Sequence, residues 1–265
     1  EAGLRTDTVH NPFPEEANRR LTARIASLHL APTATSRDNL LREGVDPSSI
    51  TVTGNTVIDA LLAVAARPLT NPHPVIESMR DTTGPVLLVT AHRRESWGEP
   101  MVTIGRAVAR LVQAIPELTV VWPLHPNPLV RESVLPEVQG LDRVLTIEPL
   151  DYHTFVHAMQ LATVVLTDSG GVQEEAPSLG KPVLVMRDNT ERPEAVIAGT
   201  AALVGTKEDL IVGEVTRLLT VPQDYERMAQ AVNPYGDGRA AERAVAAIAQ
   251  LVGIGSRMPE FEPTS

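Results

Sequence analysis

Apolar runs alternate with amphipathic segments along most of the chain after Asn55. A repeated order of β-rich run, turn and helical segment is typical of βα units around a parallel sheet. The runs are almost continuously hydrophobic, as is expected of strands that helices cover on both faces. We therefore predict an α/β fold whose main sheet has about five strands, at 85–91, 118–124, 144–148, 163–168 and 182–186.

Apolar residues at helical spacing fill the segments between these runs. Segments 101–115 and 151–161 show this spacing, which predicts helices that pack on the sheet. Upstream, prolines precede a helical pattern at 15–28, and short strands are expected at 29–32 and 50–53. These upstream elements indicate a separate, incomplete α/β layer.

The stretch 65–85 is rich in proline and poor in apolar periodicity, so we expect it to link two domains. Glu1 is not an initiator methionine, and the first five residues are typical of the exit of a strand, so we expect residues to be missing before them. The predicted parts are the remainder of an N-terminal domain at 1–65, a C-terminal domain at 66–237, and a helix with a tail at 238–265.

Composition excludes several classes of function. A net charge of −10 and a pI near 5.2 oppose unspecific binding to nucleic acid or to anionic membranes. The absence of cysteine excludes disulfides, thiolate metal sites and cysteine nucleophiles. No apolar run approaches the roughly 20 residues of a membrane helix, and no signal peptide opens the sequence. We expect a cytoplasmic protein.

The clearest chemistry lies at the end of the run 163–168. Ser169, Gly170 and Gly171 follow a predicted strand and open a predicted helix. Glycine lets the backbone approach a ligand closely, and the unpaired N–H groups and the dipole of a helix N-terminus favour an anion. The motif predicts a diphosphate site, with a plain tight turn as the alternative.

Charged residues near this motif extend the prediction. Glu175, about one and a half turns into the helix, can accept two hydroxyl hydrogen bonds, which suits a ribose diol. Arg192 follows the next strand, at the edge where open α/β sheets bind ligands. A solvated helix carboxylate and a solvated charged loop are the respective alternatives.

Two histidines, His92 and His125, follow predicted strands at the same edge. A histidine there can bind phosphate or transfer protons, and we favour His92 over the alternative of a surface residue among basic neighbours. Glu15 and Glu16 stand at a helix start, where the dipole stabilises carboxylates without any function. Only a partner such as Glu1 would convert them into acid/base groups.

Motifs along the chain occur in a fixed order: EAGLRT at 1–6, PEEANR at 14–19, TGNTVID at 53–59, HRRE at 92–95, DSGGVQEEAP at 168–177, KPV at 181–183 and TERP at 190–193. Together they resemble the non-hydrolysing UDP-N-acetylglucosamine 2-epimerases, from Glu1 to about Ala240. The resemblance implies a GT-B-like architecture of two Rossmann-like domains, with the nucleotide in the cleft between them. It also implies that the helix at 238–251 crosses back to the first domain, and that this domain is incomplete, lacking an arginine and an aspartate of the family's active site.

The resemblance implies a reaction as well. These enzymes eliminate UDP across C1–C2 to give 2-acetamidoglucal, and UDP then adds to the other face. The implied catalytic residues are Glu1, Glu15 and His92. The implied substrate-binding residues are Arg5, His92, Phe155 near uracil, Ser169, Gly170, Gly171, Glu175 on ribose, and Arg192. Leu150 departs from the glutamine that family members can carry beside the uracil segment.

No metal or redox cofactor is implied, and the expected partners are UDP-GlcNAc and UDP-ManNAc together with a second copy of the chain in a homodimer. Three alternatives remain open. A GT-B-type nucleotide-sugar glycosyltransferase would use the same phosphate and ribose groups but require an acceptor. Hydrolysing relatives would release free ManNAc and UDP, and an inactive UDP-binding fragment or sensor would show no turnover.

Overall fold

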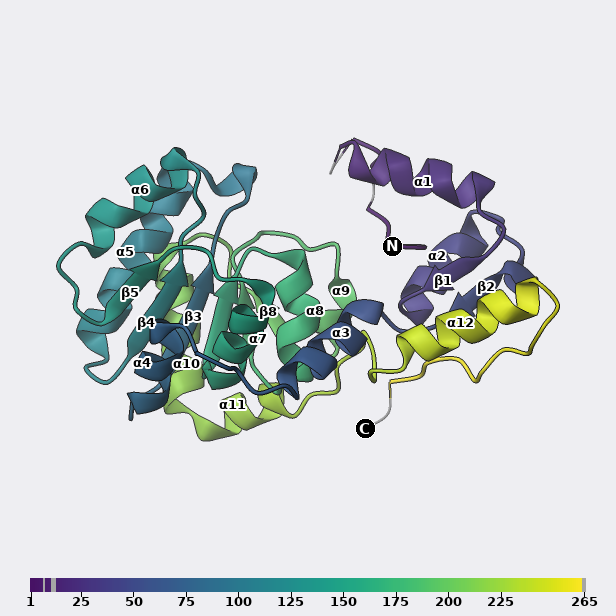
Figure 1. Ribbon diagram of the computed structural model, residues 1–265. Coiled ribbons are helices and arrows are strands. Elements are labelled where there is room, and N and C mark those ends of the chain that lie inside the picture. Colours follow the sequence, from purple (N-terminus) through teal and green to yellow (C-terminus); the bar gives the residue numbers. More distant parts are fainter. Residues whose placement is uncertain (7, 11–12, 264–265) are drawn as a thin grey trace. The chain divides into compact units, whose positions relative to one another are not determined.

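The structure is a computed structural model that describes residues 1–6, 8–10 and 13–263 (Figure 1). Contacts divide the chain into two compact units. Unit 1 comprises Glu1–Ala63 and Val232–Ser265, and unit 2 comprises Val64–Ala231. The sequence placed the corresponding divisions after residues 65 and 237.

Unit 2 is built on a six-stranded sheet in which every neighbouring pair is parallel. The spatial order is β5-β4-β3-β6-β7-β8. The strands are β3 (Val86–Thr90), β4 (Thr119–Pro123), β5 (Val144–Ile147), β6 (Val164–Thr167), β7 (Val183–Val185) and β8 (Ala201–Leu203). The predicted α/β class is confirmed, and all five expected strands are present.

The sixth strand, β8, was not predicted. It has three residues, lies at the edge of the sheet, and leaves Leu203 partly exposed. An edge strand of this length is covered incompletely, so it needs no long hydrophobic run. The sequence at 201–204 is the short apolar run Ala-Ala-Leu-Val, whose alanines make a weaker strand signal than the valine- and leucine-rich runs of the buried strands.

Helices cover both faces of this sheet (Figure 1). Parallel neighbours require right-handed crossovers, which put α5 and α6 on one face and α7 and α8 on the other. Helix α10 packs on α5, and α4 packs on α7. The helices of unit 2 are α4 (Pro74–Asp81), α5 (Glu99–Ala114), α6 (Pro128–Val138), α7 (Tyr152–Leu161), α8 (Gly170–Ser178), α9 (Pro193–Ile197), α10 (Glu208–Thr220) and α11 (Pro222–Ala229).

The expected linker at 65–85 is wrong for the part that forms α4. Pro74 occupies the first turn of this helix, where a missing N–H costs no hydrogen bond, and His73 Nδ1 caps it by accepting from the Val75 amide at 3.2 Å. Val75, Ile76 and Met79 are buried. The proline density marks a helix start rather than a flexible connection.

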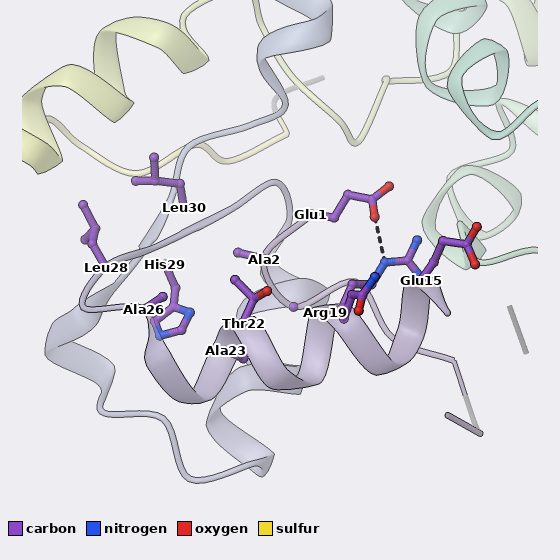
Figure 2. Close-up of a pocket in the computed structure, with 12 residues that line it drawn as sticks. Glu1, Ala2, Glu15, Arg19, Thr22, Ala23, Ala26, Leu28, His29 and Leu30 are labelled. Atoms are coloured by element: carbon purple, nitrogen blue, oxygen red, sulfur yellow. Dashed lines mark hydrogen bonds and ion pairs between the residues drawn. The ribbon is translucent and has the colours of Figure 1, made fainter. Parts of the chain in front are cut away.

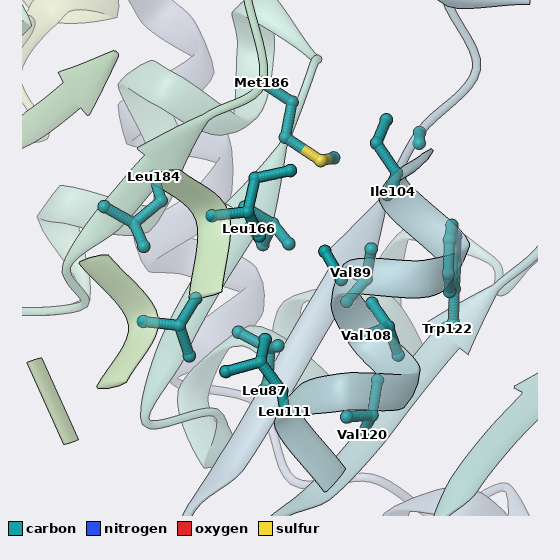
Figure 3. Close-up of a cluster of buried hydrophobic side chains, with 14 of the residues drawn as sticks. Leu87, Val89, Ile104, Val108, Leu111, Val120, Trp122, Leu166, Leu184 and Met186 are labelled. Atoms are coloured by element: carbon teal, nitrogen blue, oxygen red, sulfur yellow. The ribbon is translucent and has the colours of Figure 1, made fainter. Parts of the chain in front are cut away.

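The main core lies between the sheet and α5, on the face of the sheet that this helix covers. Figure 3 shows Leu87 and Val89 of β3 beside Val120 and Trp122 of β4, with Ile104, Val108 and Leu111 of α5 packed over them. Alternate strand residues meet helix residues spaced by three and four, as a sheet and a helix require. Each fully buried aliphatic side chain stabilises the fold by about 1.5–3 kcal/mol.

Unit 1 contains a smaller parallel pair, in which β1 (His29–Ala31) lies beside β2 (Ile50–Val52). Its helices are α1 (Glu15–Ile25), α2 (Ala34–Arg42), α12 (Ala240–Leu251) and most of α3 (Thr56–Ala65), which ends at the start of unit 2. The Asp59 carboxylate of α3 accepts the amides of Ala240 and Ala241 at 3.1 and 2.8 Å, at the start of α12. The expected helix at 238–251 is therefore present and is anchored within unit 1. Nowhere in residues 1–6, 8–10 and 13–263 is there a helix with the length and apolarity that crossing a membrane demands.

A core substitution tests the packing of unit 2. Leu166 of β6 is fully buried, so Leu166→Ala should lower the free energy of unfolding by about 2–5 kcal/mol. Leu210→Ala on α10 is the matched control, because that side chain is 51% exposed and its loss should cost within about 0.5 kcal/mol. Urea denaturation measures both, and equal effects would contradict the assigned core.

Candidate functional site

The sheet order places one pair of strand ends at a special point. From β3 the chain proceeds to β4 on one side, whereas from β6 it proceeds to β7 on the other. In open α/β sheets ligands bind outside the carboxyl ends of the strands at such a switch point. His92 follows β3 and Ser169 follows β6, so both predicted site residues stand at this point.

Helix α8 begins directly at the switch point. Ser169 occupies the cap position, and its own amide donates to Thr167 Oγ1 at 2.9 Å. Gln173 Nε2 donates to the Ser169 carbonyl at 3.1 Å, and Thr190 donates to Gln173 at 2.7 Å. The turn is held by side chains on its protein side, and the first amides of the helix present an anion-binding end.

Arg192 lies against this helix start. Its Nε donates to Glu174 Oε1 at 2.5 Å, and Nη1 lies 3.5 Å from Glu191 Oε2. A Cβ added at Gly170 would lie 2.7 Å from the Arg192 Cζ atom, whereas one added at Gly171 would meet nothing closer than 3.9 Å. A side chain at 170 would therefore displace the end of the Arg192 side chain, a crowding that the sequence did not reveal.

Arg192 belongs to a network of ion pairs in which arginines and glutamates alternate. Glu95, in the 3₁₀ helix Arg94–Ser96 that follows β3, accepts from Arg187 Nε at 2.8 Å, and Arg187 Nη2 lies 3.8 Å from Glu191. Glu191 and Glu174 in turn hold Arg192. Burying a charge is costly unless it is paired, so this arrangement keeps two nearly buried guanidinium groups in place.

His92 is fastened to the residue that precedes Ser169. The Asp168 side chain is fully buried, and its Oδ2 accepts the amides of His92 and Arg93 at 2.7 and 2.8 Å. Its Oδ1 lies 3.0 Å from His92 Nδ1. Burial would raise the pKa of Asp168, but these hydrogen bonds outweigh it, so the pKa lies below its ordinary value. The His92 ring stacks on that of His125 at a centroid distance of 5.9 Å.

Glu175 is not a solvated helix carboxylate. Only 6% of it is exposed, and its Oε1 accepts from the Tyr152 hydroxyl at 2.7 Å. Burial raises the pKa of Glu175, although the Tyr152 hydrogen bond acts in the opposite direction. Phe155 lies half-buried on α7, one turn after Tyr152. A carboxylate and two rings thus belong to the same part of unit 2, which suits a ribose and a base.

The two expected catalytic carboxylates, Glu1 and Glu15, both line a cavity of about 590 Å³ in unit 1 (Figure 2). Arg19, from α1, donates to Glu1 at 2.7 Å. The neighbouring Glu16 is fully buried and accepts from Arg20 at 2.8 Å. Of the adjacent pair, Glu16 serves the fold and Glu15 faces the cavity.

Arg5 has a structural partner. Its Nε and Nη2 donate to the two carboxylate oxygens of Glu43 at 2.7 and 2.9 Å, and its side chain is only 8% exposed. Hydrogen bonding to Arg5 holds the pKa of Glu43 below its ordinary value. Arg5 is not among the residues that line the cavity of Glu1 and Glu15, so its expected contact with substrate stays a prediction.

Sequence reasoning missed Asp168, Tyr152 and Glu174, which hold His92, Glu175 and Arg192 respectively. The position of Asp168, directly after a strand and before the Ser-Gly-Gly turn, was the one available signal. Within the described parts of the chain, no group of three or more metal-ligating side chains comes together.

A doubly wound parallel sheet, with a helix start, an arginine and a histidine at its switch point, is the arrangement typical of nucleotide-binding α/β proteins. The chain belongs to the UDP-N-acetylglucosamine 2-epimerase family, whose model matches residues 1–249.

Individual relatives agree with this assignment. A UDP-N-acetylglucosamine 2-epimerase of Yersinia pestis is 52% identical over 253 residues, which cover 94% of this chain and 67% of that protein. The solved structure of S. aureus MnaA with UDP is 42% identical, with a TM-score of 0.93 over 99% of this chain and 71% of that one. A Neisseria meningitidis UDP-GlcNAc 2-epimerase bound to UDP-GlcNAc is 44% identical, with a TM-score of 0.86 over 94% and 68% of the two chains.

The crowding at Gly170 gives a prediction. Gly170→Ala should push the guanidinium of Arg192 away from Glu174 and lower the free energy of unfolding by about 1–3 kcal/mol, the cost of a buried partner lost. Gly171→Ala is the matched control, because its Cβ would meet only ordinary contacts. Urea denaturation compares them. A Gly170→Ala protein as stable as the Gly171→Ala protein would show that Arg192 does not need this glycine.

Proposed function

We propose that this chain binds the UDP part of UDP-N-acetylglucosamine through unit 2 and interconverts that sugar nucleotide with UDP-N-acetylmannosamine. One observation carries the proposal: Arg192 lies on Gly170 at the start of α8, at the switch point of a parallel sheet. A helix N-terminus beside an arginine suits a diphosphate. The family of the chain and the UDP and UDP-GlcNAc complexes of its relatives support the same ligand.

The remaining contacts with the nucleotide follow from side chains of unit 2. Glu175, held by Tyr152, would accept the ribose hydroxyls. Phe155 would lie against uracil, and Ser169 and Gly171 would contribute amides to the diphosphate. His92 would contact the same diphosphate, since Asp168 ties it to the residue before Ser169.

The chemistry determines which other groups are needed. The C2 proton of the sugar is not adjacent to a carbonyl, so direct removal and return of that proton is too slow. Anti elimination of UDP instead gives 2-acetamidoglucal, and UDP adds back to the other face. This route needs a base at C2 and stabilisation of the departing diphosphate. A non-hydrolysing outcome also requires the intermediate to be kept from water.

Glu1 and Glu15 are the proposed acid/base groups. Inversion at C2 removes a proton from one face and delivers one to the other, so two groups suit it better than one. Both carboxylates line a single cavity of about 590 Å³, and Arg19 orients Glu1 through its ion pair. In this scheme Glu16 acts only through the fold, because its carboxylate is buried against arginines.

Calorimetry with UDP tests the nucleotide site. Arg192→Ala should weaken UDP binding by about 1.5–3 kcal/mol, the range for hydrogen bonds to charged groups. Arg110→Ala is the control, because Arg110 is an exposed arginine of unit 2 that pairs with Glu208 and Asp209. Circular dichroism checks that both variants are folded. An affinity unchanged in Arg192→Ala would remove Arg192 from the site.

Deuterium incorporation tests the reaction. In D₂O, UDP-GlcNAc should be converted to UDP-ManNAc with solvent deuterium at C2, because the abstracted proton exchanges before UDP adds back. Glu1→Gln and Glu15→Gln should each cut this exchange by at least the roughly 10²-fold typical of a lost acid/base group. Glu242→Gln, at an exposed carboxylate of unit 1, should not.

Other products would identify the alternatives. Transfer to an acceptor with C2 unlabelled would indicate a glycosyltransferase, and free ManNAc with UDP would indicate a hydrolysing enzyme. UDP binding without any turnover would leave this chain as a binding protein. Full exchange in both glutamine variants would show that the carboxylates are wrongly assigned.

A further inference from the structure

Asp168 contacts the His92 segment at several points, through both of its carboxylate oxygens and its backbone carbonyl. One oxygen accepts two successive amides, those of His92 and Arg93, and the other lies 3.0 Å from the imidazole Nδ1. The Asp168 carbonyl also accepts from Arg93 Nε at 3.1 Å. A single buried residue thus holds the backbone of the His92 segment and places a carboxylate oxygen beside its ring.

The carboxylate determines where the imidazole carries its hydrogen. Oδ1 and the ring form no hydrogen bond of good geometry, but an ionised carboxylate oxygen 3.0 Å from Nδ1 favours a hydrogen on that nitrogen over a lone pair. We therefore expect the neutral ring to be the Nδ1–H tautomer. Nε2 lies on the other side of the ring from this contact. The His92 side chain is 43% exposed, so its outer part can meet a ligand, whereas Asp168 cannot.

The same carboxylate sets the distance between His92 and the anion-binding helix. Asp168 immediately precedes Ser169, and its own amide is bonded to Thr90 on β3 at 3.1 Å. The position of the His92 ring is therefore tied, through Asp168, to the end of the strand that leads into α8. A diphosphate at the start of α8 would lie on the same edge of the sheet as His92 Nε2.

We propose that Asp168 is a positioning residue that holds His92 with Nδ1 protonated and Nε2 directed to the diphosphate of the substrate. This inference rests on the proposed function for the identity of the ligand. Asp168 itself does not touch the substrate. When the ring is positively charged, Nε2–H donates to the diphosphate oxygens, on which charge develops as UDP departs.

Replacement of the carboxylate by an amide tests the tautomer without any ligand. In Asp168→Asn the amide oxygen can still accept the two backbone hydrogens, but the NH₂ group then faces Nδ1. Nδ1 must become an acceptor, so the hydrogen should move to Nε2. Nitrogen chemical shifts of the His92 ring, identified by its loss in His92→Gln, report this change at a pH where the ring is neutral. Asp209→Asn is the control, because Asp209 is a carboxylate of unit 2 whose side chain is 88% exposed, and this substitution should leave the His92 shifts unchanged.

UDP binding tests the consequence for the site. Asp168→Asn should weaken UDP binding by up to about ten-fold, because the Nε2–H ring can still donate to the diphosphate, but as a neutral donor it forms a hydrogen bond about half as strong as a charged one. In the His92→Gln background the same substitution should add little, because Asp168 acts through His92.

The outcomes are distinct. An Nε2–H tautomer in the unaltered protein overturns the inference, even if Asp168→Asn does not fold. An equal loss of UDP affinity in the His92→Gln background also overturns it, because Asp168 would then act independently of the ring. If UDP does not bind the unaltered protein, but the tautomer is Nδ1–H and changes in Asp168→Asn, the proposed function fails and the orientation of His92 by Asp168 stands.

Discussion

Parallel pairing of β3 with β6 fixes the positions of the functional groups in unit 2. Thr90 lies opposite Thr167 at the carboxyl ends of these strands, and the Asp168 amide extends the pairing by donating to the Thr90 carbonyl at 3.1 Å. Beyond this point the two segments of the chain separate, one leading to His92 and the other to Ser169. A shift of register would move Asp168 away from the His92 amides, so the core that fixes the register also sets the site.

Charge within the site is organised locally, against the net charge of −10. Arg187 and Arg192 are nearly buried, and each is held by glutamates from other segments. Such pairing offsets desolvation and fixes the guanidinium groups before a ligand arrives, which spares the entropy of ordering them on binding. The ligand would meet a preorganised cation beside an anion-binding helix start, and the field of the whole protein matters less than this arrangement.

The sequence predicted those features that depend on local pattern. Continuous apolar runs revealed β3 to β7, and residues directly after them, such as His92 and Ser169, could be assigned to one edge of the sheet. Partners could not be predicted in this way, since the contacts of Asp168 with His92 and of Tyr152 with Glu175 depend on register and helix packing. The crowding at Gly170 could not be predicted either, because it arises from a side chain 22 positions later in the chain.

Adjacent carboxylates in unit 1 show how one helix can serve stability and chemistry together. Neighbouring residues of a helix point about 100° apart, so Glu15 and Glu16 cannot share a face. Glu16 faces inward, where Arg19 and Arg20 neutralise it. Arg19 also donates to Glu1 through a second nitrogen. Buried Glu16 therefore orients Arg19, and Arg19 in turn orients Glu1, which lines the cavity. Glu15, exposed on the same cavity, keeps the solvent access that a proton-transfer group needs.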